Sequence, residues 1–496
     1  MLKTAKIYGI NGPVIYLKGN TGFRMSEMVY VGEQKLVGEV IALDKDMTTV
    51  QVYEETTGLR PGEEVIASGS PVSVTLAPGI LNNIFDGIER PLEDIAESSG
   101  GAFITRGVSV DSLDRTKKWK THITVKQGDY LHAGDIIAEV PETHAITHKC
   151  MVPPGIEGTV LVTVADGAYT IDDLLVRLQL PDGDTKDLTM TQHWPIRTPR
   201  PTHHRFPASV PLVTGQRIID TMFPIAKGGT AAIPGGFGTG KTMTQHQIAK
   251  WADADIIIYI GCGERGNEMT QVLEEFSELT DPKSGNPLMD RTTLIANTSN
   301  MPVAAREASI YTGLTLAEYY RDMGYDVAIM ADSTSRWAEA LRELSGRLEE
   351  MPAEEGFPAY LASRLSAFYE RAGMMHNLNG TDGSVTIIGA VSPQGGDFSE
   401  PVTQNTKRFV RCFWGLDKSL AYARHFHWLT SYSEYLNDLS HWYQDNVSPK
   451  FVDYRNRLMA LLNQESSLLE IVKLIGSDVL PDDQKLILEI ARVIRL

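Results

Sequence analysis

One short stretch constrains the fold of this 496-residue chain more than any other part of its sequence. The pattern Gly-x-x-x-x-Gly-Lys-Thr runs from Gly235 to Thr242. Glycine has no Cβ, so consecutive backbone N–H groups can turn toward one point and bind anionic oxygens there. A helix that begins near Lys241 would add its own N-terminal donors. The stretch therefore predicts a phosphate-binding loop, which consists of Gly235, Gly236, Phe237, Gly238, Thr239 and Gly240.

Lys241 and Thr242 carry the chemistry that this loop predicts. The Lys241 ammonium can reach the β- and γ-phosphates of a nucleotide, and the Thr242 hydroxyl can ligate Mg²⁺. Residues 243–251 have helical spacing, and residues 256–260 form a continuous apolar run that is typical of a buried parallel strand. Strand, glycine loop, helix and strand is the context that separates such a loop from a glycine-rich turn that binds nothing.

Two charged residues, Glu264 and Arg265, follow the apolar run 256–260. We expect this strand to lie next to the strand of the phosphate loop, where α/β folds bind ligands at the carboxyl ends of their strands. Glu264 could then orient and deprotonate a water for attack on the γ-phosphate, and Arg265 could hold the phosphate or the carboxylate. A salt-bridged surface pair in a glycine-rich loop is the alternative.

A second acid follows a second apolar run. Residues 327–331 lead to Asp332, and Arg336 lies a short step further. In nucleotide hydrolases an acid in this place holds Mg²⁺, usually through water. The alternative is a buried strand that happens to end in aspartate. Further on, Phe426 or Trp428 could stack on an adenine ring, although aromatic residues more often belong to the core.

The rest of the chain divides by its pattern. Residues 1–70 show the short strands of a small closed barrel, 71–110 a connector, 111–190 a second β-rich region, 191–208 a Pro-rich extended linker, 191–430 an α/β domain, and 431–496 helices. We expect the last helices at 451–462, 467–474 and 484–494, and we expect this helical domain to be incomplete at Leu496. His144, His148 and His193 match no common zinc spacing, so we expect solvated or structural histidines.

Composition excludes some functions. The formal net charge is −17, which opposes a nucleic-acid surface, since that requires a basic stripe. The three cysteines are far apart and odd in number, which favours a reducing compartment over a disulfide framework. No apolar run approaches the length that spans a bilayer.

Taken together, these stretches resemble the catalytic A subunit of V-type and archaeal-type rotary ATPases. The resemblance is carried by the phosphate loop and by residues 214–217, 261–268, 297–308, 331–339 and 395–405. It covers essentially the whole chain, because residues 111–190 resemble the bulge domain that separates A subunits from F-type β subunits. The phosphate loop separates the chain from the non-catalytic B subunits, which lack one.

The resemblance implies a multidomain fold. Its parts are an N-terminal β-barrel, a β-rich bulge insert, a central α/β P-loop (RecA-like) nucleotide-binding domain and a C-terminal α-helical domain. It implies ATP hydrolysis or synthesis coupled to H⁺ or Na⁺ transport through partner subunits. These partners are B subunits in an alternating A3B3 ring, central-stalk and peripheral-stalk subunits, and indirectly the membrane sector, with no nucleic acid. The chain would then be cytoplasmic and peripheral to the membrane.

The resemblance also assigns site residues. It places Lys241 and Thr242 at the phosphates of ATP or ADP and at Mg²⁺, Glu264 as the general base or water-orienting carboxylate, Arg265 as a phosphate contact, Asp332 at Mg²⁺ through water, and Phe426 on one side of the adenine pocket.

Two other functions fit part of the pattern. A hexameric P-loop nucleic-acid translocase would have basic loops, which the net charge of −17 opposes. A non-catalytic nucleotide-binding scaffold would lack Lys241 or Glu264, and both are present.

Overall fold

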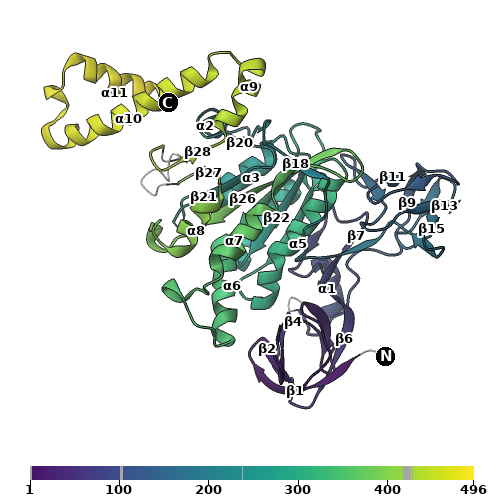
Figure 1. The fold of residues 1–496 in the computed structure, drawn as a ribbon. Coiled ribbons are helices and arrows are strands. Elements are labelled where there is room, and N and C mark those ends of the chain that lie inside the picture. The colour runs from purple at the N-terminus through teal and green to yellow at the C-terminus, as the bar shows by residue number, and fades with distance from the viewer. Residues whose placement is uncertain (1–2, 101–103, 237, 417–425, 427, 496) are drawn as a thin grey trace.

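The computed structural model describes residues 3–100, 104–236, 238–416, 426 and 428–495, and Figure 1 shows how they are arranged. The chain begins with a closed six-stranded barrel in the order β1-β2-β5-β4-β3-β6. Its strands are β1 (Thr4–Asn11), β2 (Val14–Lys18), β3 (Glu27–Val31), β4 (Leu36–Leu43), β5 (Met47–Val52) and β6 (Glu64–Pro71). Inward-facing apolar residues such as Val29, Val40 and Val65 fill the barrel. The strands expected from the sequence, at 5–10, 14–17, 28–31, 36–43 and 48–53, did not include β6, whose second half is polar.

The β-rich insert consists of two antiparallel four-stranded sheets, β10-β13-β15-β16 and β12-β11-β9-β14. Its strands are β9 (Trp119–Ile123), β10 (Tyr130–Leu131), β11 (Ile136–Pro141), β12 (Thr147–Met151), β13 (Gly158–Thr163), β14 (Gly167–Tyr169), β15 (Val176–Gln179) and β16 (Thr185–Leu188). Outside the insert, β7 (Ser73–Leu76) pairs with β17 (Gln192–Pro195), the strand that follows the insert in the chain. The insert projects to one side of the α/β domain (Figure 1).

The central domain is organised around a sheet in the order β28-β27-β21-β26-β24-β22-β23-β8. From β27 to β8 the strands are parallel. β28 pairs antiparallel with β27, the side strand β25 pairs antiparallel with β26, and β18 pairs antiparallel with β25. The parallel strands are β8 (Ile84–Phe85), β21 (Thr230–Pro234), β22 (Ile256–Cys262), β23 (Thr292–Asn297), β24 (Asp326–Asp332), β26 (Asp382–Val391) and β27 (Cys412–Phe413). The others are β18 (His204–Phe206), β25 (Gly373–His376) and β28 (Tyr432–Ser433), with a separate pair β19 (Pro211–Leu212) and β20 (Ile225–Ala226).

The strand order corrects one expectation. β22 does not lie next to β21, because β26 and β24 lie between them. The chain leaves β21 through one helix and enters β22 on the far side of these two strands. Strands that come later in the sequence fill that space, so succession along the chain does not imply adjacency in the sheet.

Helices cover both faces of this sheet, as a continuously apolar parallel sheet requires. They are α1 (Leu92–Ser99), α2 (Arg217–Met222), α3 (Lys241–Trp251), α4 (Gly266–Glu278), α5 (Val303–Asp322), α6 (Thr334–Arg347), α7 (Leu361–Glu370) and α8 (Pro401–Phe409), with 3₁₀ turns at Leu288–Arg291, Glu354–Gly356 and Gln394–Gly396. Helix α5 is the most enclosed, since every one of its residues except Arg306 is buried. It packs on β22 and β24 and also reaches β7 at the base of the insert (Figure 1).

Buried ion pairs join α5 to the other domains. Arg197 donates to Glu39 of the barrel at 2.8 Å and to Glu307 of α5 at 2.8 Å. Arg200 donates to Asp322, at the end of α5, at 2.6 Å. The Pro-rich segment 191–208, expected to be an extended linker, is thus docked along this helix.

The histidines expected to be solvated or structural are placed accordingly. His148 is fully buried, and its ring nitrogens lie 2.8 Å from Glu142 and 2.9 Å from the Tyr319 hydroxyl. This contact joins the insert to α5. His144 is largely exposed beside Asp290.

The C-terminal part is helical, with α9 (Leu436–Asn446), α10 (Phe451–Ile475), a 3₁₀ turn at Ser477–Val479 and α11 (Asp482–Arg495). The expected break between residues 462 and 467 is wrong, because α10 continues through it. Helices α10 and α11 form a hairpin at the end of the molecule opposite the barrel (Figure 1). Among the described residues no helix has both the length and the apolar character needed to cross a membrane.

Candidate functional site

The predicted phosphate loop connects the carboxyl end of β21 to the N-terminus of α3. Gly238 and Gly240 adopt positive φ angles of 78° and 92°, which glycine reaches without steric penalty. A Cβ on Gly235 would lie 2.3 Å from the Thr239 hydroxyl oxygen, so the turn also needs glycine there. Thr239 donates back to the carbonyl of Gly236 at 2.9 Å and closes the loop. Phe237, which the motif includes in this loop, lies outside the described residues.

Lys241 is the first residue of α3, and its ammonium points back into the loop. It donates to the carbonyl oxygens of Gly235 at 2.8 Å and Gly236 at 3.0 Å. Burial lowers the pKa of Lys241, and the charges of Asp332 and Glu264 partly oppose that shift. The lysine is therefore enclosed, near acids, and bonded to neutral acceptors that a phosphate oxygen can replace.

Asp332 ends β24 beside the first turn of α3. Its Oδ2 accepts a hydrogen bond of 2.6 Å from the Thr242 hydroxyl and another of 3.1 Å from the Tyr259 hydroxyl. Burial, followed by the charge of Asp332, raises the pKa of Tyr259 well above its ordinary value. The predicted pair of Thr242 and Asp332 is thus brought together, with a third residue that no motif identifies.

Glu264 follows β22 at the carboxyl ends of the strands, the same edge of the sheet at which Asp332 lies. Residue Gly261 of β22 stands in register with Asp332 of β24, so the two acids lie near one another. Burial, then the charge of Asp332 and a hydrogen bond with Glu268, raise the pKa of Glu264 to about 8. A carboxyl whose pKa is shifted in this way near neutral pH is the kind of group that enzymes use as a general base.

Two arginines enclose the turn before Glu264. A Cβ on Gly263 would lie 2.7 Å from the Cβ of Arg336 and 3.0 Å from the Cδ of Arg306, so glycine permits their close approach. Arg306 donates to the Ser299 carbonyl at 2.7 Å. Burial by itself lowers the pKa of Arg336, but Glu339, Glu264 and Glu268 outweigh it and raise the pKa. Arg336 is therefore a cation that faces the acids of the site.

Arg265 and Phe426 have different surroundings. Arg265 caps α4 at its N-terminus and is exposed beside Glu264. Phe426 is only 4% exposed and packs edge-on against Trp414, with ring centroids 6.4 Å apart. It pairs with Leu416, whose backbone N–H donates to Pro234 just before the phosphate loop. Phe426 thus lies close to the loop, as part of the core in the described residues, and its role at an adenine ring stays a prediction.

Sequence reasoning missed Glu268, Tyr259 and Arg306 as site residues. Glu268 lies four residues after Glu264, in the first turn of α4, and that helix begins two residues after Glu264. That spacing could have revealed it. Tyr259 and Arg306 sit inside a strand and a helix and carry no local pattern, so only the fold brings them to the site.

The oxygens present fit Mg²⁺. Thr242 and Asp332 supply hydroxyl and carboxylate oxygens 2.6 Å apart at the end of the phosphate loop, and Mg²⁺ prefers oxygen ligands while retaining several waters. Within the described part of the chain, His, Cys, Asp and Glu form no group of three or more that could hold a metal by itself.

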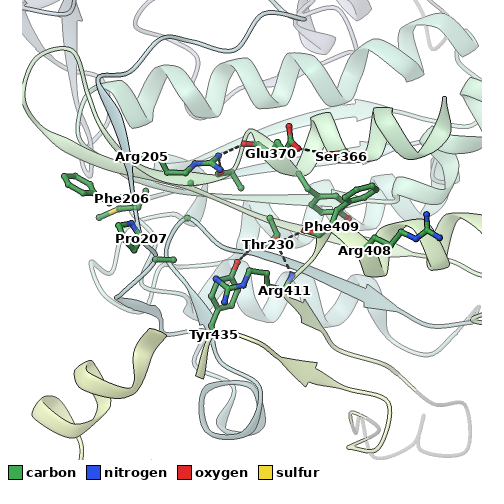
Figure 2. Close-up of a pocket in the computed structure, with 16 residues that line it drawn as sticks. Arg205, Phe206, Pro207, Thr230, Ser366, Glu370, Arg408, Phe409, Arg411 and Tyr435 are labelled. Atoms are coloured by element: carbon green, nitrogen blue, oxygen red, sulfur yellow. Dashed lines mark hydrogen bonds between the residues drawn. The ribbon is translucent and has the colours of Figure 1, made fainter. Parts of the chain in front are cut away.

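A separate cavity of about 420 Å³ lies at the other edge of the sheet, near the amino end of β21. Figure 2 shows Thr230 and Tyr435 in its wall, with Arg205, Arg408 and Arg411 pointing in different directions. Arg411 is 2.8 Å from Asp438, and Arg205 donates to backbone carbonyls. These cations do not converge on one point, so the phosphate-loop edge remains the candidate active site.

Comparison with known proteins assigns four parts of the chain to domains of related proteins. Models of the ATP synthase alpha/beta family match residues 7–69 as its beta-barrel domain, 110–197 as its barrel-sandwich domain and 215–433 as its nucleotide-binding domain. The C-terminal domain of V and A type ATP synthase matches residues 440–496.

Whole-chain relatives agree. The V-type ATP synthase alpha chain of Halothermothrix orenii is 61% identical over 500 residues, covering 100% of this chain and 85% of the relative. The V-type ATP synthase alpha chain 2 of Clostridium tetani is 62% identical over 493 residues (99% and 83%). The A subunit of the A-type ATP synthase of Methanopyrus kandleri is 58% identical over 495 residues (99% and 83%).

Proposed function

This chain belongs to the ATP synthase alpha/beta family, in its V-type and A-type branch, and from that membership we propose how its residues carry out ATP chemistry. It is an enzyme, the catalytic nucleotide-binding subunit of a multi-subunit V/A-type ATP synthase. The family opposes both alternatives, the nucleic-acid translocase and the non-catalytic scaffold. The proposal is carried by one observation, the meeting of Lys241, Thr242, Asp332 and Glu264 at one edge of the sheet.

The loop and Lys241 bind the phosphates of ATP or ADP. Lys241 donates to two neutral carbonyls of its own loop, so exchange for phosphate oxygens breaks no ion pair. A charge-assisted hydrogen bond replaces a neutral acceptor, which favours the bound state. The backbone N–H groups at the start of α3 add a partial positive charge at the same place.

Glu264 accepts the proton of the attacking water, or orients that water, during hydrolysis. Its pKa of about 8 makes it a stronger base than an ordinary carboxylate, and it lies beside Asp332. Arg265, at the start of α4, contacts a phosphate from the exposed side of the site. The positive charge of Arg336 partly offsets the negative charges of the neighbouring acids Glu264 and Glu268.

Thr242 would hold Mg²⁺ directly, and Asp332 would hold it through water. When bound, the ion neutralises charge on the phosphate oxygens. The chain's part is to present two oxygens at the end of the loop and to keep the Asp332 carboxylate oriented.

The subunit works in a ring in which three copies alternate with three non-catalytic B subunits. Central-stalk and peripheral-stalk subunits connect the ring to a membrane sector, so that ATP hydrolysis or synthesis is coupled to H⁺ or Na⁺ transport. The chain then lies in the cytoplasm, peripheral to the membrane. Phe426 borders the adenine ring from the side of Leu416 and the phosphate loop. The net charge of −17 supports a complex without nucleic acid.

The test is Glu264→Gln in the assembled complex. The amide has nearly the same shape but accepts no proton, so we expect ATP hydrolysis to fall by about 10²-fold or more while Mg-nucleotide affinity is retained. The matched control is Glu274→Gln on the exposed side of α4, which should leave both quantities unchanged. Loss of nucleotide affinity with Glu264→Gln would make this residue a binding or structural group.

A further inference from the structure

Among the described residues, two hydroxyls donate to the Asp332 carboxylate, and one of the two belongs to the phosphate-loop motif. Thr242 reaches Oδ2 at 2.6 Å and Tyr259 reaches the same oxygen at 3.1 Å. The first donor stands on α3 directly after the loop, and the second stands on β22 inside the sheet. The two donors therefore differ in how far they depend on the state of the loop.

The loop must change its bonds when phosphate binds. Lys241 now donates to the carbonyls of Gly235 and Gly236, and a phosphate takes the ammonium away from them. Thr242 is the next residue along the chain, so its hydroxyl also responds to the ligand. The described contacts show no hydrogen bond between Tyr259 and the phosphate loop. The Tyr259 hydroxyl meets the loop region only through the Asp332 oxygen to which Thr242 also donates.

The sheet brings the Tyr259 hydroxyl to Asp332. Tyr259 and Gly261 are two residues apart on β22 and so lie on one face of the sheet. Gly261 is in register with Asp332 on β24, which places that carboxylate on the same face. Gly261 has no side chain, and the Met269 thioether of α4 fills the space that a Cβ there would need; the Tyr259 hydroxyl reaches the Asp332 carboxylate directly.

Neighbouring rings hold the phenol in this direction. Tyr259 is 1% exposed. The His246 ring of α3 packs against it at 5.6 Å between centroids, and the Phe276 ring of α4 packs at 5.5 Å. His246 is itself fixed by Glu275 at 2.8 Å. A ring enclosed from two helices keeps its hydroxyl in one place while the loop rearranges.

We propose that Tyr259 is a positioning residue that holds the Asp332 carboxylate in the orientation needed for the water shell of Mg²⁺. This inference rests on the proposed function, because it assumes Mg-nucleotide binding at this edge. Tyr259 touches neither nucleotide nor metal, and it acts through Asp332. Donors to a metal-binding group commonly change metal affinity by about 10–100-fold when removed.

The experiment compares Tyr259→Phe with Tyr435→Phe in the assembled complex. Both replacements delete one hydroxyl from a buried ring, and the Tyr435 hydroxyl accepts a bond from the Thr230 backbone at the opposite edge of the sheet. ADP binding is titrated against free Mg²⁺, with a parallel titration in chelator. For Tyr259→Phe we expect about a tenfold rise in the Mg²⁺ concentration for half-maximal binding, with unchanged ADP affinity in chelator. Tyr435→Phe should match the wild type.

The same substitution made in an Asp332→Asn variant distinguishes a positioning role of Tyr259 from a general effect on stability. In Asp332→Asn, the further change Tyr259→Phe should have no additional effect on the Mg²⁺ requirement, because the group through which it acts is already altered. An unchanged Mg²⁺ requirement for Tyr259→Phe, an equal shift in Tyr435→Phe, or an effect that persists in Asp332→Asn would each overturn the inference. Failure of Tyr259→Phe alone to assemble would overturn it too, since it would show a structural role. If the wild-type complex binds no ADP at all, the proposed function fails instead.

Discussion

Two regions of the molecule enclose charged side chains: the junction of Arg197 with Glu39 and Glu307, and the catalytic edge formed by Lys241, Glu264 and Asp332 at the carboxyl ends of the strands. The buried charges have opposite kinds of partner in the two regions. At the junction, Arg197 lies 2.8 Å from both Glu39 and Glu307, so each acid has a cation. At the catalytic edge, Asp332 accepts from hydroxyls, Glu264 bonds to another acid, and Lys241 donates to neutral carbonyls.

The pKa directions show the same contrast. At Arg197 burial favours the neutral form, yet Glu307 and Glu39 raise the pKa well above its ordinary value. At Glu264 burial and the neighbouring acids raise the pKa to about 8, and at Lys241 burial lowers it. The junction is thus complete by itself and holds three domains together. The charges of the catalytic edge are incompletely neutralised by the protein itself, so that a phosphate ligand and a cation can neutralise them on binding.

The strongest test of this contrast is Lys241→Ala. Lys241 is the cation that the site holds on replaceable acceptors, so we expect turnover in the assembled complex to fall by about 10³-fold or more. Thermal stability should hardly change, because no ion pair is broken. Lys250→Ala, at the other end of the same helix, is the control for helix effects. ATP hydrolysis and unfolding temperature are measured together, and normal turnover would remove Lys241 from the mechanism.

Arg197→Met tests the opposite region. It leaves Glu39 and Glu307 buried without their cation, which typically destabilises by about 3–5 kcal/mol. The triple variant Arg197→Met, Glu39→Gln, Glu307→Gln removes the whole charge set and should recover much of this loss. Urea unfolding of both variants measures the difference. Equal stability of the single and triple variants would show that the junction is not held by its ion pairs.

The smallest expected effect concerns the pH profile. Hydrolysis needs the ionised form of Glu264, so kcat/KM should rise with pH through about 8. Glu268→Gln removes an acid and a hydrogen bond that raise this pKa, so the rising limb should move to lower pH. The position of the limb is compared with that of Glu274→Gln, which should not shift it. An unmoved limb in Glu268→Gln would mean that Glu268 does not set the pKa of Glu264.

Much of the fold could be predicted from local patterns. Short strands separated by turns indicated the barrel, and a continuous apolar run indicated β22 as a buried strand. The prediction failed where a local signal was weak or absent. Strand β6 has a polar second half, and α10 runs unbroken through residues 462–467. The docking of the Pro-rich segment could not be predicted, because its partners Glu39 and Glu307 lie more than a hundred residues away from Arg197 in either direction.

The phosphate loop could be identified from the sequence, because all its parts lie between Gly235 and Thr242. Its function depends on the conformational freedom of its glycines and on side chains that stand directly after them in the chain. What surrounds the loop is set only in the folded chain. Folding establishes the strand order that places β26 and β24 between β21 and β22, directs the Tyr259 hydroxyl at Asp332, and raises the pKa of Glu264. These properties arise from pairing and burial between segments far apart in the chain, and such contacts leave no pattern within any one segment.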